Sequence, residues 1–155
     1  MSSKGEPVNP RYQALLQLLR TADNVWNASR RFFEKWDLSP SQFNVINLLR
    51  DSRTGMSQTE LSEELITHRS NVTGLVDRLE KRGFVRRTPM ASDRRAHNVV
   101  LTRRGAELLG EILPRYYQNS EQVVATLSTK RAAELINDLR VVSKNAEKIA
   151  IEPQP

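Results

Sequence analysis

The stretch over residues 56–105 limits the fold of this 155-residue chain more than any other part of it. Ser57 and Glu60 have the spacing of a capping box, which predicts that a short helix begins there. A second helix is predicted over about 68–82, because its apolar residues recur at helical spacing and Gly83 is suited to end it. These apolar residues are Val72, Leu75, Val76 and Leu79.

Two short runs with β-type composition follow, at 84–89 and 96–101, and a polar turn at 90–95 connects them. Two short helices followed by a hairpin are the layout of a winged helix-turn-helix. In that fold one helix enters a DNA groove and the hairpin lies beside it. The sequence therefore predicts a mainly α-helical fold with a small β-hairpin wing and with long helices on both sides.

Positive charge is concentrated in the same part of the chain. Residues 81–104 contain eight Lys and Arg side chains and a single acid, Asp93, whereas the whole chain has a net charge of +6. Such a patch suits a polyanion, because contacts with phosphates release counterions. The alternative is a solvated run of charge on an ordinary surface. The predicted hairpin in the same segment favours nucleic acid.

A long helix is predicted over about 11–36, with a stripe of mainly apolar residues at heptad-like spacing. The stripe consists of Tyr12, Leu15, Leu19, Ala22, Trp26, Ser29, Phe33 and Trp36. Its apolar surface is broader than a small DNA-binding core covers, so we expect a second subunit to cover it. An ordinary core helix is the alternative.

Three further helix starts are indicated by capping residues. Ser39 and Gln42 form a second capping-box pattern, and later helices are predicted to begin at Thr102 and at Ser128. The predicted division of the chain is 11–37 as an N-terminal dimerisation helix, 38–105 as a winged helix-turn-helix DNA-binding domain, and 106–150 as C-terminal dimerisation helices.

Composition argues against several other classes of protein. The chain has no cysteine, which excludes disulfides, thiolate metal sites and cysteine-based redox sensing. There is no apolar run of about 18 residues and no signal-peptide core, so we expect a cytoplasmic protein without a membrane partner. The only histidines, His68 and His97, lack metal-ligand spacing, and no Gly-rich phosphate loop is present. We therefore expect no enzyme, no metal and no cofactor.

With these features the chain resembles the MarR family of bacterial transcription regulators. The matching segments are LSPSQFNVINLL (38–49), MSQTELSEEL (56–65), RSNVTGLVDRLEKRGFVRR (69–87), SDRR (92–95) and VVLTRRG (99–105). The resemblance implies a homodimer with interlocked terminal helices, a recognition helix at about 68–82 in the major groove of double-stranded DNA, and a wing at the minor groove. It also implies that a small aromatic or anionic effector lowers the affinity for DNA.

The wing supplies one group of candidate DNA contacts. The resemblance places Asp93 and Arg95 at the minor groove, and Arg95, with Arg94 as the alternate, is the candidate for insertion there. The negative potential of a narrow minor groove attracts Arg. Asp93 is assigned an ion pair that orients the wing, and Arg86 is a further basic candidate. The alternative for Asp93, Arg94 and Arg95 is an exposed charged turn.

The recognition helix supplies a second group. Ser70, Asn71 and Thr73 are candidates for hydrogen bonds to base edges or phosphates. Arg69 and Arg78 are candidates for phosphate contacts.

Further positions on the recognition helix and at the start of the preceding helix complete the set of candidates. Asp77 can accept from cytosine N4, and Gly74 marks a close approach of the backbone to DNA unless it is there by chance. His68 is a DNA contact or a surface residue. Gln58 and Thr59 suit phosphate contacts at the start of the preceding helix, with plain helix capping as the alternative.

An effector site is inferred from aromatic content and from the family analogy. An Arg beside aromatic rings suits an aromatic carboxylate or phenolate. The candidate residues are Trp26, Arg30, Phe33, Phe43 and Tyr116. Packing in the core or in a dimer interface is the alternative, and it is favoured for any single one of them.

These observations together predict a sequence-specific, ligand-responsive repressor that acts as a homodimer on a pseudo-palindromic operator, with activation as the other possible sign. Half-sites are expected about 10–10.5 bp apart. The alternative is a winged-helix module for protein interaction or non-specific nucleic-acid binding, without an effector. Exposed Arg rather than apolar residues at the wing favours DNA. RNA is disfavoured, because the basic segment lacks interleaved aromatic residues.

Overall fold

The computed structural model describes residues 9–66, 71–89 and 97–151. The chain forms two compact units, and the boundary between them along the sequence lies between Leu109 and Gly110. The helices are α1 (Pro10–Phe33), α2 (Pro40–Leu48), α3 (Gln58–Glu64), α4 (Val72–Lys81), α5 (Arg103–Val124) and α6 (Thr129–Ile151). Two 3-10 turns are η1 (Glu34–Trp36) and η2 (Leu49–Asp51), and the strands are β1 (Met56–Ser57), β2 (Val85–Pro89) and β3 (His97–Leu101).

The long first helix agrees with its prediction except at its end. The α-helix stops at Phe33, and the 3-10 turn Glu34–Trp36 continues it for one turn. Asp37 then adopts a left-handed conformation with φ of 51° and turns the chain toward α2. Asp tolerates this conformation better than most residues, because its short polar side chain bonds locally.

Both predicted capping boxes are present. The Ser39 backbone donates to Gln42 Oε1 at 2.8 Å, and the Gln42 backbone donates to Ser39 Oγ at 3.1 Å. At the start of α3 the Ser57 backbone donates to Glu60 Oε2 at 2.7 Å, and the Glu60 backbone donates to Ser57 Oγ at 3.2 Å. Hydrogen bonds from Ser57 hold the pKa of the Glu60 carboxyl below its usual value. Both helix starts are therefore determined locally.

Gly83 ends α4 as predicted, with φ of 75°. Its backbone N–H donates to Glu80 O at 2.8 Å, and the next N–H, of Phe84, donates to Leu79 O at 3.0 Å. This pair of bonds is a Schellman motif, which reverses the chain directly out of a helix. Strand β2 consequently begins only two residues after Gly83 and remains close to α4.

The sheet has three antiparallel strands in the order β1-β3-β2. The hairpin of β2 and β3 was predicted, and its register pairs Val85 with Leu101 and Pro89 with His97. The two-residue strand β1 was not predicted. It pairs with β3 because Gly55, with φ of 78°, lets the chain approach so closely that a Cβ there would lie 2.4 Å from Val99 O.

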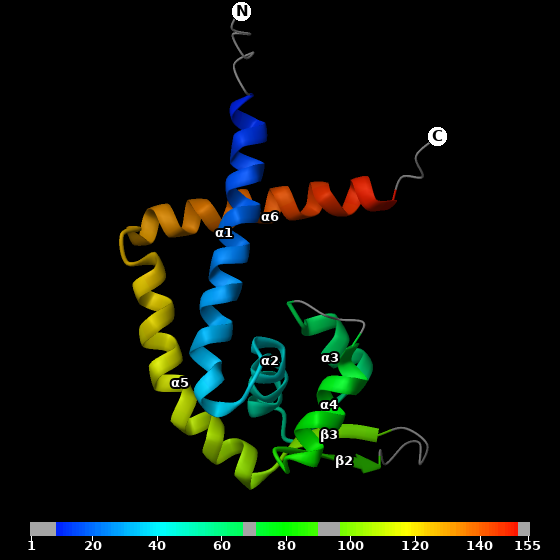
Figure 1. Ribbon diagram of the computed structural model, residues 1–155. Helices are drawn as coiled ribbons and strands as arrows, with labels where there is room; N and C mark the ends of the chain where they lie inside the picture. Colours follow the sequence, from blue (N-terminus) through cyan, green and yellow to red (C-terminus); the bar gives the residue numbers. More distant parts are fainter. Residues whose placement is uncertain (1–8, 67–70, 90–96, 152–155) are drawn as a thin grey trace, which may run out of the picture. The chain divides into compact units, whose positions relative to one another are not determined.

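One apolar core joins the sheet to α2, α3 and α4 in the first unit, where these helices contact one another (Figure 1). The end of α1 joins it through Phe33, whose ring stacks on Phe43 of α2 with centroids 4.4 Å apart. The buried apolar side chains are Phe33, Leu38, Phe43, Val45, Ile46, Leu49, Leu61, Leu65, Val72, Leu75, Val76, Leu79, Phe84, Val85, Val99 and Leu109.

The second unit contains most of α5 and all of α6. One side of α6 is apolar, but the large side chains on that side are exposed. They are Leu135, Ile136, Leu139 and Val142. No helix within the described ranges is both long and apolar enough to span a membrane.

Candidate nucleic-acid interface

Helix α4 buries one side and exposes a polar half that faces away from the core. Val72, Leu75, Val76 and Leu79 are its buried residues, as the helical spacing predicted. The remaining positions form two neighbouring stripes along the helix. Within each stripe the residues are three or four positions apart, so they are neighbours on the helix surface. The first consists of Thr73, Asp77 and Glu80, and we call it the clamp stripe. The second consists of Asn71, Gly74, Arg78 and Lys81, and we call it the open stripe.

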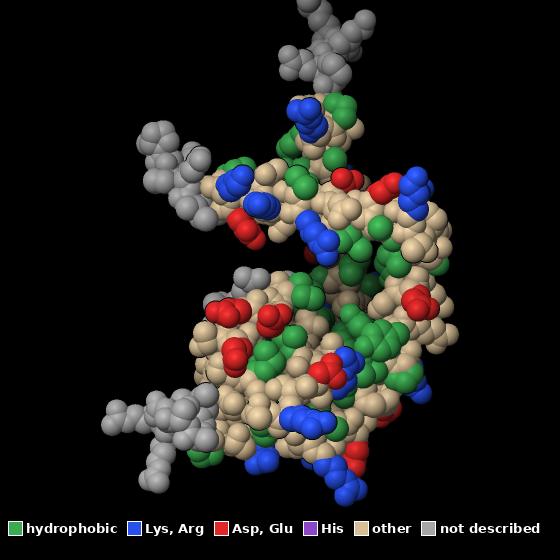
Figure 2. Space-filling model, turned by 180° about the vertical axis from the view of Figure 1, so that it is seen from behind, with side chains coloured by type: hydrophobic (Ala, Val, Ile, Leu, Met, Phe, Trp, Pro, Cys, Tyr) green, Lys and Arg blue, Asp and Glu red, His purple; other side chains and the backbone are tan. Residues whose placement is uncertain are grey.

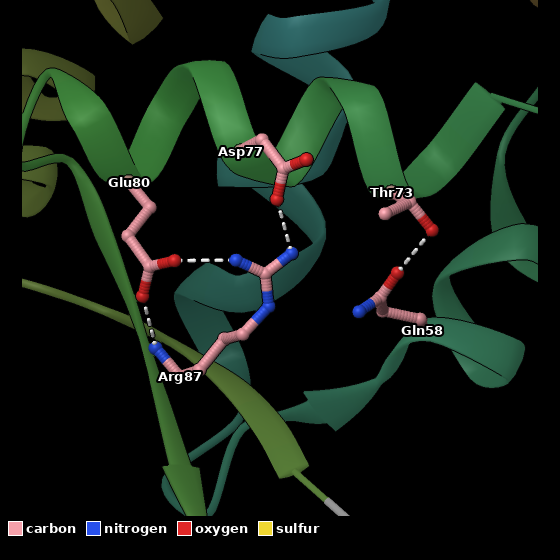
Figure 3. Close-up of polar contacts among 5 residues, drawn as sticks. All are labelled: Gln58, Thr73, Asp77, Glu80 and Arg87. Atoms are coloured by element: carbon pink, nitrogen blue, oxygen red, sulfur yellow. Dashed lines mark hydrogen bonds and ion pairs between the residues drawn. The ribbon is translucent and has the colours of Figure 1, made fainter.

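Every residue of the clamp stripe is bonded to a neighbouring element (Figure 3). Thr73 Oγ1 donates to Oε1 of Gln58, the first residue of α3, at 2.7 Å. Arg87 of β2 donates through Nη2 to Asp77 Oδ1 at 2.6 Å and through Nη1 to Glu80 Oε2. The Arg87 backbone also donates to Glu80 Oε1 at 2.8 Å. We call the contacts of Arg87 with the two acids the Arg87 clamp.

The Arg87 clamp is partly shielded from water. The side chain of Arg87 is 24% exposed, that of Glu80 35% and that of Asp77 58%. The hydrogen bond to Asp77, together with the bond and charge of Glu80, raises the pKa of the Arg87 guanidinium above its usual value. Arg87 therefore stays charged and offsets one of the two acidic charges on the polar half of α4.

The open stripe presents cations without acids. Arg78 and Lys81 are exposed, and neither forms an ion pair with any residue in the described part of the chain. Gly74 leaves room for the Asn71 carboxamide, because a Cβ at Gly74 would lie 2.6 Å from Asn71 Oδ1. The glycine thus has a local structural reason within the helix, beside the close DNA approach considered from the sequence.

The basic run at 81–104 divides into paired and unpaired residues. Besides Arg87, Arg103 pairs with Glu107 at 2.8 Å, and Arg82 lies 3.6 Å from Asp37 Oδ2. Arg82 also donates to the backbone oxygens of Trp36, at 2.9 Å, and of Asp37. Arg87 and Arg82 hold elements of the fold together and Arg103 has an acidic partner at the surface, so the net charge of the segment overstates the charge available to a polyanion.

The remaining basic residues of this run that the structure describes are Lys81, Arg86 and Arg104. All three are exposed. The guanidinium of Arg104 lies 5.2 Å from the Phe84 ring centroid. Arg86 occupies the strand position next to Arg87, and neighbouring strand residues point to opposite faces of a sheet. Arg86 therefore stays available where Arg87 is engaged.

The other candidate DNA contacts differ in their exposure, and some of them lie outside the described residues. Thr59 is exposed in the first turn of α3, and Gln58 is half-buried and bonded to Thr73. Asn71 and Thr73 are exposed at the start of α4. Helix α4 runs from Val72 to Lys81, and the predicted start near residue 68 lies outside the described residues. The candidates outside the described residues are His68, Arg69, Ser70, Asp93, Arg94 and Arg95.

The candidate effector residues are distributed over both units. Phe33 and Phe43 stack on each other in the core of the first unit, as the packing alternative expected. Trp26 is half-buried on α1, and Arg30 is exposed one turn further along the same helix. Tyr116 belongs to the second unit and packs near Tyr117, with ring centroids 5.9 Å apart.

Sequence reasoning missed Arg87 and Glu80 as partners. The run of positive charge was counted as a whole, and Asp77 was considered only as a contact for cytosine. A signal for the pairing does exist, because Asp77 and Glu80 lie three residues apart on one helix face. Gly83 ends the helix, and the chain leads directly into β2. This connection brings Arg87 to the helix face that carries Asp77 and Glu80.

Comparisons with known proteins agree with this geometry. The model of the MarR family matches residues 38–97. The uncharacterised HTH-type transcriptional regulator YfiV of Bacillus subtilis is 30% identical over 113 residues, which span 73% of this chain and 70% of that protein.

Two solved structures share the fold. The crystal structure of Sco3205, a MarR family transcriptional regulator from Streptomyces coelicolor in complex with DNA, gives a TM-score of 0.78 at 23% identity, covering 93% of this chain and 92% of that chain. Bordetella bronchiseptica BpsR, whose DNA binding is regulated by 6-hydroxynicotinic acid, gives a TM-score of 0.72 at 24% identity, covering 92% and 97%.

Proposed function

The chain belongs to the MarR family of DNA-binding transcription regulators, and we propose that it is a ligand-responsive repressor whose homodimer binds a pseudo-palindromic operator. The observation that carries the proposal is the polar half of α4. Its open stripe offers Arg78 and Lys81, which pair with no acid among the described residues, beside a stripe in which Arg87 offsets one of two acidic charges. A surface arranged in this way accepts the negative potential of a duplex.

In this proposal α4 enters the major groove, and its open stripe contacts base edges and phosphates. Asn71 is suited to hydrogen bonds with bases, and Arg78 to phosphates. Thr59 and Gln58, at the start of α3, contact phosphates beside the groove. The wing continues from β2 and β3 to the minor groove, where Arg95 is inserted and Asp93 orients the wing.

The homodimer is supported by large apolar side chains that a single chain leaves in water. On α1 these are Tyr12, Leu15 and Leu19, and Figure 2 shows hydrophobic side chains exposed on this helix next to its N-terminal end. On α6 they are the four large residues of its apolar side. Burial of apolar surface contributes about 25 cal/mol per Å², so a second copy of these helices is their natural cover. We assign dimerisation to 11–37 and 106–150, and DNA binding to 38–105.

The proposed effector is a small aromatic or phenolic anion. Arg30 and Trp26 lie one turn apart on α1, so that a cation and an aromatic ring can contact one ligand. The response of BpsR to 6-hydroxynicotinic acid shows that a protein of this fold uses a ligand of this chemistry. Binding of the ligand restrains the two recognition helices of the dimer at a spacing that no longer matches the operator. The protein acts by binding in the cytoplasm and catalyses no reaction.

Selection of duplexes from a random-sequence DNA library by the purified protein tests the proposal. The expected result is a motif with two-fold symmetry and half-sites about 10–10.5 bp apart. Addition of 6-hydroxynicotinic acid and a panel of aromatic acids to the complex then tests for release. A library that stays random after repeated rounds would contradict a sequence-specific function. Enrichment that no acid of the panel reverses would contradict the proposed effector class.

A further inference from the structure

We infer that Arg87 is a positioning residue that fixes the wing to the recognition helix, and that Asp77 serves this clamp instead of reading a base. The inference rests on the proposed function, because it concerns how two DNA-contacting elements are held in register. It assigns roles to three side chains, Asp77, Glu80 and Arg87, that lie in contact in Figure 3.

The clamp supplies a second attachment between β2 and α4. The first is the Schellman turn, which joins the elements at the C-terminal end of the helix through Gly83. The apolar core also joins the sheet to α4, but apolar packing is non-directional and does not by itself set the angle of the strand. Arg87 binds α4 at Asp77 and at Glu80, almost one helical turn apart, so it fixes the direction of the strand as well as its distance. The backbone bond from Arg87 to Glu80 fixes its height along the helix.

The position of Arg87 in the hairpin makes this attachment effective. Arg87 pairs with Val99, a fully buried residue of β3, in the middle of the five-residue strand β2. The contact therefore acts on the paired strands, not on the loop that joins them. An orientation fixed in the middle of the hairpin sets the direction in which both paired strands extend from α4. We infer that this direction decides which phosphates and bases the wing can contact.

The chemistry requires an arginine. A planar guanidinium reaches two carboxylates with separate N–H groups, whereas a lysine ammonium is a compact point charge that cannot reproduce this fork. Oδ1 of Asp77 accepts from Arg87 at 2.6 Å, which orients the carboxylate toward β2 and offsets its charge, so the clamp weakens Asp77 as an acceptor for a cytosine. The bond between Thr73 and Gln58 restrains the same face of α4 from the side of α3. The clamp stripe thus orients the DNA-binding elements, and the open stripe contacts the duplex.

The substitution Arg87→Lys tests the inference, because it keeps the charge and removes the fork. Fluorescence anisotropy would be recorded on a duplex selected by the wild-type protein and on a shuffled duplex of the same composition. Affinity for the selected duplex is expected to fall about tenfold, with unchanged affinity for the shuffled duplex and an unchanged salt slope. Arg103→Lys is the matched control, since it alters an exposed pair with Glu107 at the start of α5, and it should change neither affinity.

Wild-type affinity of Arg87→Lys for the selected duplex would overturn the inference. Equal losses on both duplexes would also overturn it, because they would show a phosphate contact in place of a positioning role. Circular dichroism and thermal melting of each variant establish that it is folded. A wild-type protein that prefers no duplex would instead contradict the proposed function, and the inference with it.

Asp77→Asn separates the two roles considered for this carboxylate and does not depend on the lysine variant. The duplex selection would be repeated with this variant. The clamp predicts weaker preferences at several positions of each half-site, including those next to the wing. Loss of preference at a single base pair would identify Asp77 as a base-reading residue and overturn its assignment to the clamp.

Discussion

Similar apolar side chains are buried in the first unit and exposed on helix α6. In the first unit Leu61 and Leu79 are completely buried by neighbouring elements of the same chain. On α6, Ile136 and Leu139 follow an equally regular helical spacing but remain exposed. Periodicity thus predicts which face of a helix is apolar, but not whether the same chain covers it. The first unit buries its own core, whereas α6 exposes an apolar side that we propose a second copy of the chain covers.

The largest effect is expected from a charge on the apolar side of α6, which should prevent dimerisation. Ile136→Glu is expected to convert the dimer to monomers and to lower operator affinity about 100-fold, because two linked half-site contacts become independent. Val141→Glu is the matched control, since Val141 is 61% exposed, compared with 49% for Ile136, and lies near the opposite side of α6. Sedimentation velocity measures the association state of both variants. A dimer that survives Ile136→Glu would show that α6 is not the interface.

A pair of leucine truncations tests the difference at the level of stability. Leu79→Ala leaves a cavity in the core of the first unit and should lower the free energy of unfolding by about 3 kcal/mol. Leu139→Ala should act through the dimer, so its effect on the denaturation midpoint should depend on protein concentration. Urea denaturation at two protein concentrations measures both. If both variants lost the same unfolding free energy at both protein concentrations, the proposed role of α6 in dimerisation would be contradicted.

Two glycine substitutions within α4 and its end sharpen the account of the first unit. Gly83→Ala forces a side chain into a left-handed conformation, with φ of 75°, and should cost about 1–2 kcal/mol of unfolding free energy. Gly74→Ala has the opposite sign, because alanine favours the helix interior by up to about 1 kcal/mol. It should nevertheless weaken DNA binding, since the new Cβ displaces the Asn71 carboxamide. Thermal melting measures the stability of Gly74→Ala, and fluorescence anisotropy measures its affinity for DNA. A variant that gained both stability and DNA affinity would refute the prediction.

The smallest expected effect is a pH dependence at the start of α3. Hydrogen bonds from Ser57 lower the pKa of Glu60 from its usual 4.5, so the folded state binds this proton less readily than the unfolded state. The resulting stabilisation is present above pH 4.5 and is lost as the pH falls through the lowered pKa. Unfolding free energies of the wild type and of Glu60→Gln, measured between about pH 6 and pH 3, should differ less at low pH. A constant difference would contradict the role of the carboxylate.

The features predicted correctly from the sequence are those set by nearby residues. Both capping boxes, the glycine that ends α4 and the β2–β3 hairpin were predicted, and the structure confirms them. The MarR resemblance and the winged helix-turn-helix fold are also confirmed. Each capping box spans only four residues, so a short pattern contains all the information that it needs.

The features that were missed depend on partners distant along the chain. Strand β1 has two residues and exists only because it pairs with β3, more than 40 positions later. In the sequence Arg87 is one of eight basic residues in a run, and only the fold places it beside two acids of α4. Arg82 is likewise engaged, by backbone oxygens of the turn between α1 and α2. Charge counting along the sequence cannot separate such residues from those that stay free.

Fluorescence anisotropy across a salt series tests the central claim most directly. The purified protein would be titrated onto the selected duplex, onto a shuffled duplex and onto a duplex with one half-site. The account predicts that the selected duplex binds two chains and remains preferred at about 0.15 M salt, while affinity for the shuffled duplex falls steeply with salt. Equal binding of all three duplexes, with a common steep loss at higher salt, would contradict sequence-specific recognition by a dimer.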